Sequence, residues 1–175
     1  MDVHPIFVHF PIGLLTFYVA IEVVSIIFKR RLDLNTFTLR AVLVIAGSLA
    51  SYATLATGDG AEDLILDRTL GSIVEAHSFW AELSTAIFTI LAVGYLLAFI
   101  FRNEVINLWI QRKFSWFYEV LLLVKQIILN QNIRLFLALI GLLAITITGA
   151  LGGAIVYGPE IDPIISVIYH WFFNY

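Results

Sequence analysis

Four long apolar segments, separated by shorter polar connections, dominate the pattern of hydrophobic and polar positions along this chain. The segments cover about residues 5–28, 37–57, 77–101 and 133–157. A helix needs roughly 20 apolar residues to cross a bilayer, and none of the segments shows the alternating pattern of a β-barrel strand. The pattern therefore predicts four transmembrane helices.

The ends of these segments carry turn signals. Pro5 and Pro11 lack an amide hydrogen, so the first helix begins either near Pro5, with a distortion at Pro11, or at Pro11 itself. The Gly-Asp-Gly sequence at 58–60 predicts the end of the second helix. The connection that follows, 61–76, is partly amphipathic and is expected to form a short interfacial helix, with His77 opening the third span.

The stretch between the third and fourth segments has a polar part, residues 103–113, and an apolar part, residues 114–130. Glu119 and Lys125 interrupt the apolar part, and a charge at mid-bilayer costs about 2.5–3.5 kcal/mol. We therefore interpret 114–130 as a helix that lies in the cytoplasmic membrane interface, anchored by its aromatic residues. A fifth span is the alternative, and it would move the C-terminus to the other side of the membrane.

The C-terminal stretch, residues 162–175, begins with a helix-start signature. Asp162 is suited to cap a helix and Pro163 to occupy its first position. Aromatic residues around His170 end the stretch, which is typical of a segment at the membrane surface. The predicted fold is an all-α integral membrane protein of one domain, residues 1–175. It is a four-transmembrane-helix bundle with one cytoplasmic interfacial helix and a C-terminal interfacial helix.

Composition agrees with this fold and excludes several classes of function. The chain is 61% hydrophobic and 13% charged, with a mean hydropathy of +0.95, which is far too apolar for a soluble domain of this size. It has no cysteine, so disulfides, thiolate ligands, iron–sulfur clusters and covalently attached haem are excluded. It has no protease, hydrolase or nucleotide-binding fingerprint, which favours an electron-transfer or accessory subunit over an autonomous enzyme.

Positive charge is concentrated around two connections. The residues are Lys29, Arg30, Arg31 and Arg40 at the first, and Arg102, Arg112, Lys113, Lys125 and Arg134 at the second. Basic loops stay in the cytoplasm, so we expect a multi-pass protein of the cell (plasma) membrane with extracytoplasmic N- and C-termini. Topology accounts for these charges, and nothing supports nucleic-acid binding. The acidic outer side either steers a basic extracytoplasmic electron carrier or simply lacks positive charge.

All four histidines are expected together at the outer face. They are His4, His9, His77 and His170. His9 and His77 each fall within the first two turns of a predicted span, so we expect them at similar depths. Several histidines near a membrane surface suggest ligands for haem or another metal.

Small residues recur on the helix faces near the histidine level. They include Gly13 one turn below His9, Ala81 one turn below His77, and Gly149 and Gly153 in the fourth segment. Two accounts fit these positions. Small residues let helices pack closely in lipid, which needs no cofactor. Alternatively, they make room for a haem b macrocycle with His9 and His77 as axial ligands, and one haem is favoured over two.

His4 and His170 are candidate ligands of a second metal site. The competing interpretations are a solvated terminal histidine for His4 and an amphipathic surface anchor for His170. A further alternative to haem is zinc, copper or iron bound by His4, His9 and His77.

Glu22 and Glu82 are ionisable residues inside the predicted spans, where such groups usually face a partner or a cavity. Glu82 lies about 7 Å below His77 along the helix, though turned about 140° away. We assign it as a proton relay or as a carboxylate that orients a histidine ligand. Glu22 lies near the cytoplasmic end, where a contact with Arg30 or Arg40 is expected, and it receives no function.

The opening of the chain resembles a known family. Residues 4–15 read HPIFVHFPIGLL, similar to the HPxxVHFPIxLL opening of domain of unknown function 2231, a family of predicted four-helix membrane proteins from bacteria and archaea. Further similarities are Thr57-Gly58, His77 and the run GALGGAIVYG at 149–158. The resemblance covers about residues 1–160 and implies a four-helix bundle with His4, His9 and His77 as motif positions. It implies no reaction, although some relatives carry cytochrome-like or iron–sulfur domains, which implies a redox setting.

These observations lead to a hypothesis of electron transfer. The expected protein is a membrane-bound b-type cytochrome or cytochrome-like subunit that transfers electrons near the extracytoplasmic face, between an extracytoplasmic carrier and a larger complex or the quinone pool. The alternatives are a cofactor-free structural or assembly subunit of a respiratory-type membrane complex, and a non-haem metal-binding membrane protein. The expected partners are the lipid bilayer and other membrane subunits.

Overall fold

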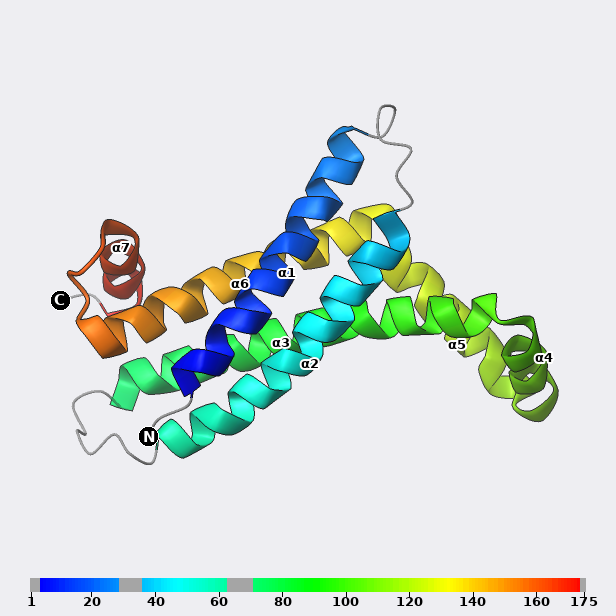
Figure 1. The fold of residues 1–175 in the computed structure, drawn as a ribbon, viewed down its shortest axis with the longest axis horizontal. Helices are drawn as coiled ribbons and strands as arrows, with labels where there is room; N and C mark the ends of the chain where they lie inside the picture. The colour runs from blue at the N-terminus through cyan, green and yellow to red at the C-terminus, as the bar shows by residue number, and fades with distance from the viewer. Residues whose placement is uncertain (1–3, 29–35, 63–70, 174–175) are drawn as a thin grey trace.

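The structure is a computed structural model that describes residues 4–28, 36–62 and 71–173 (Figure 1). The described residues form seven α-helices and no strand. The helices are α1 (His4–Ile27), α2 (Thr36–Glu62), α3 (Gly71–Arg102), α4 (Glu104–Lys113), α5 (Ser115–Leu129), α6 (Gln131–Tyr157) and α7 (Pro163–Phe172). Of these, α1, α2, α3 and α6 are long and apolar enough to cross a membrane. The prediction of an all-α chain with four span-length helices is confirmed.

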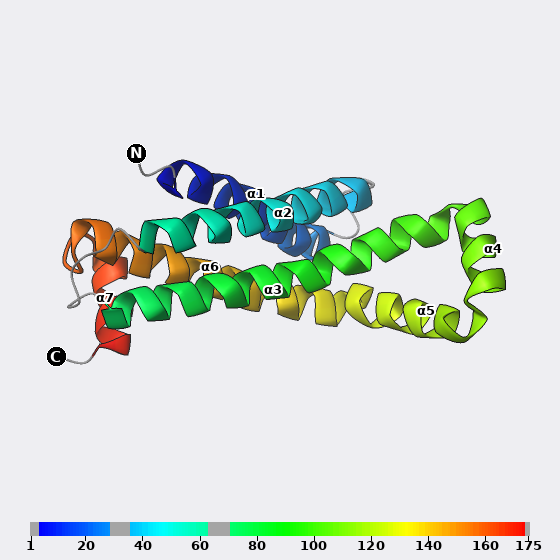
Figure 2. The same cartoon turned by 90° about the horizontal axis from the view of Figure 1, so that it is seen from below.

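The four span-length helices form a ring of neighbours. α1 packs on α2, α2 on α3, α3 on α6 and α6 on α1, so α1 and α3 lie at opposite corners. Figure 2 shows α1 and α2 on one side of α3 and α6. The start of α1 and helix α7 lie at one end of the molecule, and α4 lies at the other. Segments predicted for the two membrane faces therefore lie at opposite ends.

Large side chains fill the centre of the bundle, and glycines on neighbouring helices make room for them. Phe88 and Leu15 are buried there. A Cβ added at Gly141 would lie 2.7 Å from the Phe88 ring, and one added at Gly47 would lie 2.5 Å from Leu15. These glycines serve the close packing by which apolar helices associate in lipid.

Two predicted boundaries are wrong. α2 continues past the turn signal at 58–60, because a glycine costs a formed helix only about 1 kcal/mol. α3 begins at Gly71 rather than at His77. Ile73 is buried in a cluster with residues of α6 and α7, and this tertiary contact extends α3 beyond the apolar run. Residues 63–70 of the predicted interfacial segment lie outside the described residues.

The two terminal helices match their predictions. α1 starts at His4 and continues through Pro11 as one helix, so the earlier of the two expected starts is correct. α7 is capped by Asp162, whose Oδ1 accepts a hydrogen bond of 2.8 Å from the Ile164 amide, and Pro163 occupies the first position. α7 packs back against α6.

The stretch between α3 and α6 forms two helices. The sequence did not predict α4, which Asn103 caps by accepting a hydrogen bond of 3.1 Å from the Ile106 amide. The helix predicted at 114–130 is confirmed as α5, and its length of about 22 Å is too short to cross a bilayer. α5 packs along α3, and α4 and α5 reach beyond α1 and α2 (Figure 2).

Candidate functional site

Glu22 of α1 is a fully buried carboxylate at the end of the bundle nearer α4. Its Oε1 accepts hydrogen bonds from the Tyr95 hydroxyl at 2.8 Å and the Tyr18 hydroxyl at 3.2 Å. Arg134 Nε lies 2.7 Å from the same oxygen, in an ion-pair contact that lacks hydrogen-bond alignment. Arg40 Nη1 donates to Oε2 at 3.1 Å. We call these five residues the Glu22 network.

Each span-length helix supplies part of the Glu22 network. Tyr18 and Glu22 are four residues apart and therefore share one face of α1. Tyr95 belongs to α3. Arg40 lies near the start of α2 and Arg134 near the start of α6. One carboxylate therefore ties four helices together.

The carboxylate of Glu22 is paired with donor groups on both of its oxygens. An ionised carboxylate offers roughly four lone-pair sites, and four donor groups surround the two Glu22 oxygens. A buried charge requires such pairing, because an unpaired one is strongly destabilising. The geometry suits a carboxylate that holds helices together.

Aromatic rings extend the Glu22 network to a third arginine. The Phe37 ring of α2 lies 5.2 Å from the Tyr95 ring. The guanidinium carbon of Arg102, at the end of α3, lies 3.8 Å from the centre of the Phe37 ring, which is a cation–π contact. Three arginines, from α2, α3 and α6, therefore gather at this end of the bundle.

Only part of the Glu22 network could be predicted from the sequence. The expected contact of Glu22 with Arg40 is confirmed, and Arg30 lies outside the described residues. The contacts of Arg134 and Tyr95 were missed because they depend on which helices are neighbours. A signal was available, since a carboxylate inside an apolar span requires a positive or hydrogen-bonding partner.

His77 lies inside α3 and is turned toward α6. Its Nδ1 is 2.9 Å from the carbonyl oxygen of Thr148. A Cβ added at Gly152 would lie 3.0 Å from Cε1 of His77, so the imidazole ring occupies the space that this glycine leaves. Ala81, one turn further along α3, accepts hydrogen bonds from two hydroxyl side chains through its carbonyl oxygen.

The structure places His9 and His77 on helices at opposite corners of the ring. His9 is exposed on α1. The side chain of His4 lies outside the described residues. Among the side chains that the structure describes, no three His, Asp or Glu residues form a group that could hold a metal ion. A two-histidine haem site stays a prediction.

The predicted small residues differ in their surroundings. A Cβ at Gly153 would lie 2.8 Å from Ile165 of α7, so this glycine serves helix packing. Gly13 and Gly149 have nothing within 4 Å of their Cβ positions. Close packing therefore explains the first position, and open space beside the helix remains at the other two.

His170 of α7 pairs with an acidic residue of the loop before it. Its Nε2 lies 2.8 Å from Oε1 of Glu160, and Ser166 donates a hydrogen bond of 3.1 Å to Oε2 of the same carboxylate. The hydrogen bond from His170, and after it the one from Ser166, lowers the pKa of Glu160. The contact gives His170 a role in joining α7 to its loop, and the predicted second metal site stays a prediction.

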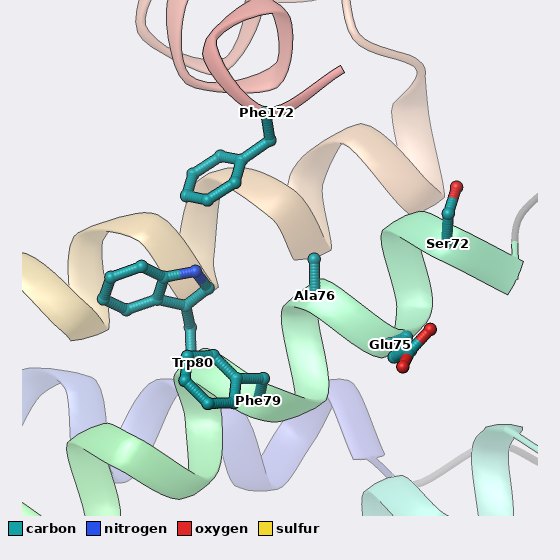
Figure 3. A pocket seen from close by; sticks show the side chains of 6 residues that line it. All are labelled: Ser72, Glu75, Ala76, Phe79, Trp80 and Phe172. Carbon is teal, nitrogen blue, oxygen red and sulfur yellow. The ribbon is translucent and has the colours of Figure 1, made fainter.

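An open pocket of about 410 Å³ lies between α3 and α7 (Figure 3). It is lined by Ser72, Glu75, Ala76, Phe79, Trp80 and Phe172. The Phe172 ring stands 5.9 Å from the Trp80 ring, edge to face. None of the predicted site residues lines this pocket. Glu82, predicted as a proton relay, is exposed on α3.

No protein-family model, curated protein or solved structure matches the chain. The resemblance of its opening motif to domain of unknown function 2231 therefore stays a prediction. Function has to be argued from the Glu22 network, the histidines and the exposed surfaces.

Proposed function

We propose that this chain is a cofactor-free structural or assembly subunit of a membrane complex. The observation that carries the proposal is the Glu22 network, in which one fully buried and ion-paired carboxylate links all four span-length helices. A site for chemistry needs a group that a substrate can reach, whereas Glu22 is fully buried and is paired on both oxygens. Close packing at Gly47 and Gly141 supports the same function.

In this proposal the bundle spans the cell membrane, and lipid is its first partner. The described lysines and arginines belong to the end of the bundle that carries α4, and basic ends stay in the cytoplasm. The N- and C-termini are then extracytoplasmic. α7 lies in the outer interface, with exposed Trp171 as its anchor. α5 packs along α3 and extends the bundle on the cytoplasmic side, so it departs from the expected helix in the plane of the interface.

Helix α4 is the surface that we assign to other membrane subunits. It has no buried residue. Its exposed apolar side chains are Val105, Ile106, Leu108 and Trp109. Contiguous exposed apolar surface marks a contact with protein or membrane, and α4 lies beyond α1 and α2, where another chain reaches it without displacing a helix of the bundle.

The test is purification of the full chain in mild detergent from haem-replete cells. We expect colourless protein that migrates together with other membrane chains. Trp109→Ser should release those chains, whereas Trp171→Ser, at a more exposed tryptophan on α7, should retain them. Recovery of the chain alone, or a haem absorption band in the purified protein, contradicts the proposal.

A membrane-bound b-type cytochrome is the second candidate, favoured by the contact of His77 Nδ1 with the Thr148 carbonyl. A ligand histidine usually donates one ring N–H to a carbonyl or carboxylate, and His77 Nδ1 is placed for such a bond. His77 and His9 would hold the haem, and open space at Gly13 and Gly149 is compatible with it. Haem, when bound, supplies one-electron transfer, and the acidic outer end would attract a basic extracytoplasmic carrier.

The second candidate is tested by absorption spectra of the same preparation. A reduced-minus-oxidised Soret signal and a pyridine haemochrome are expected if haem is bound, and His77→Ala should abolish or alter both. His170→Ala should leave the spectra unchanged, because Nε2 of His170 already contacts the Glu160 carboxylate. Protein without a haemochrome eliminates this candidate.

A further inference from the structure

We propose that the basic end of the bundle binds the phosphate group of an anionic phospholipid through Arg40, Arg102 and Arg134. The starting point is an imbalance of charge. Glu22 carries one negative charge, whereas Arg40 and Arg134 carry two positive charges against it. Among the described residues, Glu22 is the only acidic side chain that forms an ion pair with these arginines. Counted over the described residues, the network therefore lacks one negative charge.

Within the part of the chain that the structure describes, the two arginines keep donors that no other residue uses. A guanidinium group has five N–H donors in a planar fork. Arg40 donates to Glu22 and, through Nε, to the Thr36 carbonyl at 3.2 Å. Arg134 contacts Glu22 and donates through Nη1 to the Leu129 carbonyl at 3.1 Å. Their side chains remain 14% and 15% exposed, so the remaining donors reach a ligand at the surface.

The helix termini add to the positive potential at this end. Arg40 and Arg134 lie close to the first turns of α2 and α6, whose N-terminal ends carry partial positive charge. An arginine there is unfavourable by itself, and a bound anion offsets this repulsion because it attracts both the guanidinium group and the helix end. Phosphate matches both the helix termini and the guanidinium forks.

Arg102 supplies the third contact, and its position favours a lipid over a free anion. Its guanidinium group is exposed and is held against Phe37, which in turn packs on Tyr95 of the Glu22 network. Each of the three arginines lies near one terminus of its helix. The outward faces of these helices carry exposed apolar side chains, such as Leu39 on α2 and Phe99 on α3. Basic sites between spanning helices at the cytoplasmic side bind anionic headgroups in this way, with acyl chains along the helices.

The test compares lipid retention by native mass spectrometry of the full chain in detergent. We expect a single phosphatidylglycerol to be retained in preference to phosphatidylcholine of the same acyl chains. Arg102→Gln should weaken retention about fivefold, the factor for one basic residue near an anionic surface. Arg112→Gln removes the same charge from exposed α4 and should leave retention unchanged. Neither arginine contacts Glu22, so both variants should fold.

Three results would overturn the proposal. Equal retention of the two lipids would show that the site does not select an anionic headgroup. An equal effect of the two substitutions would show that general surface charge, and not a site, retains the lipid. Displacement of phosphatidylglycerol by the same concentration of inorganic phosphate would show that the site binds a free anion and not a lipid. If Arg102→Gln unfolds the protein, the test uses the wild-type chain: retention of phosphatidylglycerol must decrease as ionic strength rises, because salt screens exposed charges. Retention that does not change with salt would contradict the site.

Discussion

At the scale of the residue, Glu22 carries the most consequential interactions of the molecule. Its carboxylate is fully buried and is matched by Arg40, Arg134 and two tyrosine hydroxyls. Removing one partner of a buried ion pair costs about 3–5 kcal/mol, because the other charge remains buried. We expect Glu22→Gln to lower the free energy of unfolding by that amount, measured by denaturation in detergent micelles.

The matched control is Glu119→Gln, the same change at an exposed carboxylate of α5, outside the span-length helices. Exposed substitutions usually alter stability by no more than about 0.5 kcal/mol. Equal stability of the two variants would mean that the Glu22 network does not hold the four helices together.

At the scale of the element, α6 offers two glycines in contrasting surroundings. A Cβ at Gly141 would lie 2.7 Å from the fully buried Phe88 ring, whereas one at Gly149 meets nothing within 4 Å. We expect Gly141→Ala to destabilise the protein by about 1–3 kcal/mol through overpacking. Gly149→Ala should stabilise it by up to about 1 kcal/mol through helix propensity. Thermal unfolding of both variants measures the difference, and a loss of stability at Gly149 would reveal an unrecognised neighbour there.

The attachment of α7 should depend on pH through Glu160. Its pKa lies below the ordinary value of 4.5, mainly because of the hydrogen bond from His170. The contribution of this contact is therefore present above pH 4.5 and is lost as the pH falls through the lowered pKa. Tryptophan fluorescence should report the loss, since Trp80 packs against Phe172 of α7. Glu160→Gln should remove the transition, and an unchanged acid transition in that variant would assign it to another group.

At the scale of the whole molecule, the sequence predicted the four span-length helices because a long apolar run is a local signal. The early start of α3 could not be predicted, because Ile73 is buried against residues of α6 and α7. The same holds for the Glu22 network, where Glu22 and Arg134 meet only once α1 and α6 are neighbours. A small residue in the sequence does not distinguish close helix packing from space for a cofactor. In the structure Gly153 faces the Ile165 side chain, whereas Gly13 faces open space.

The orientation of the whole molecule in the membrane can be measured directly, because the chain has no cysteine. Lys113 on α4 and Ile161 in the loop before α7 are both exposed and lie at opposite ends of the bundle. The positive-inside rule places Lys113 in the cytoplasm and Ile161 outside. A membrane-impermeant maleimide should therefore label Ile161→Cys in intact cells and Lys113→Cys only after permeabilisation. The reverse pattern would invert the topology, and labelling of both in intact cells would show that the bundle does not span the membrane.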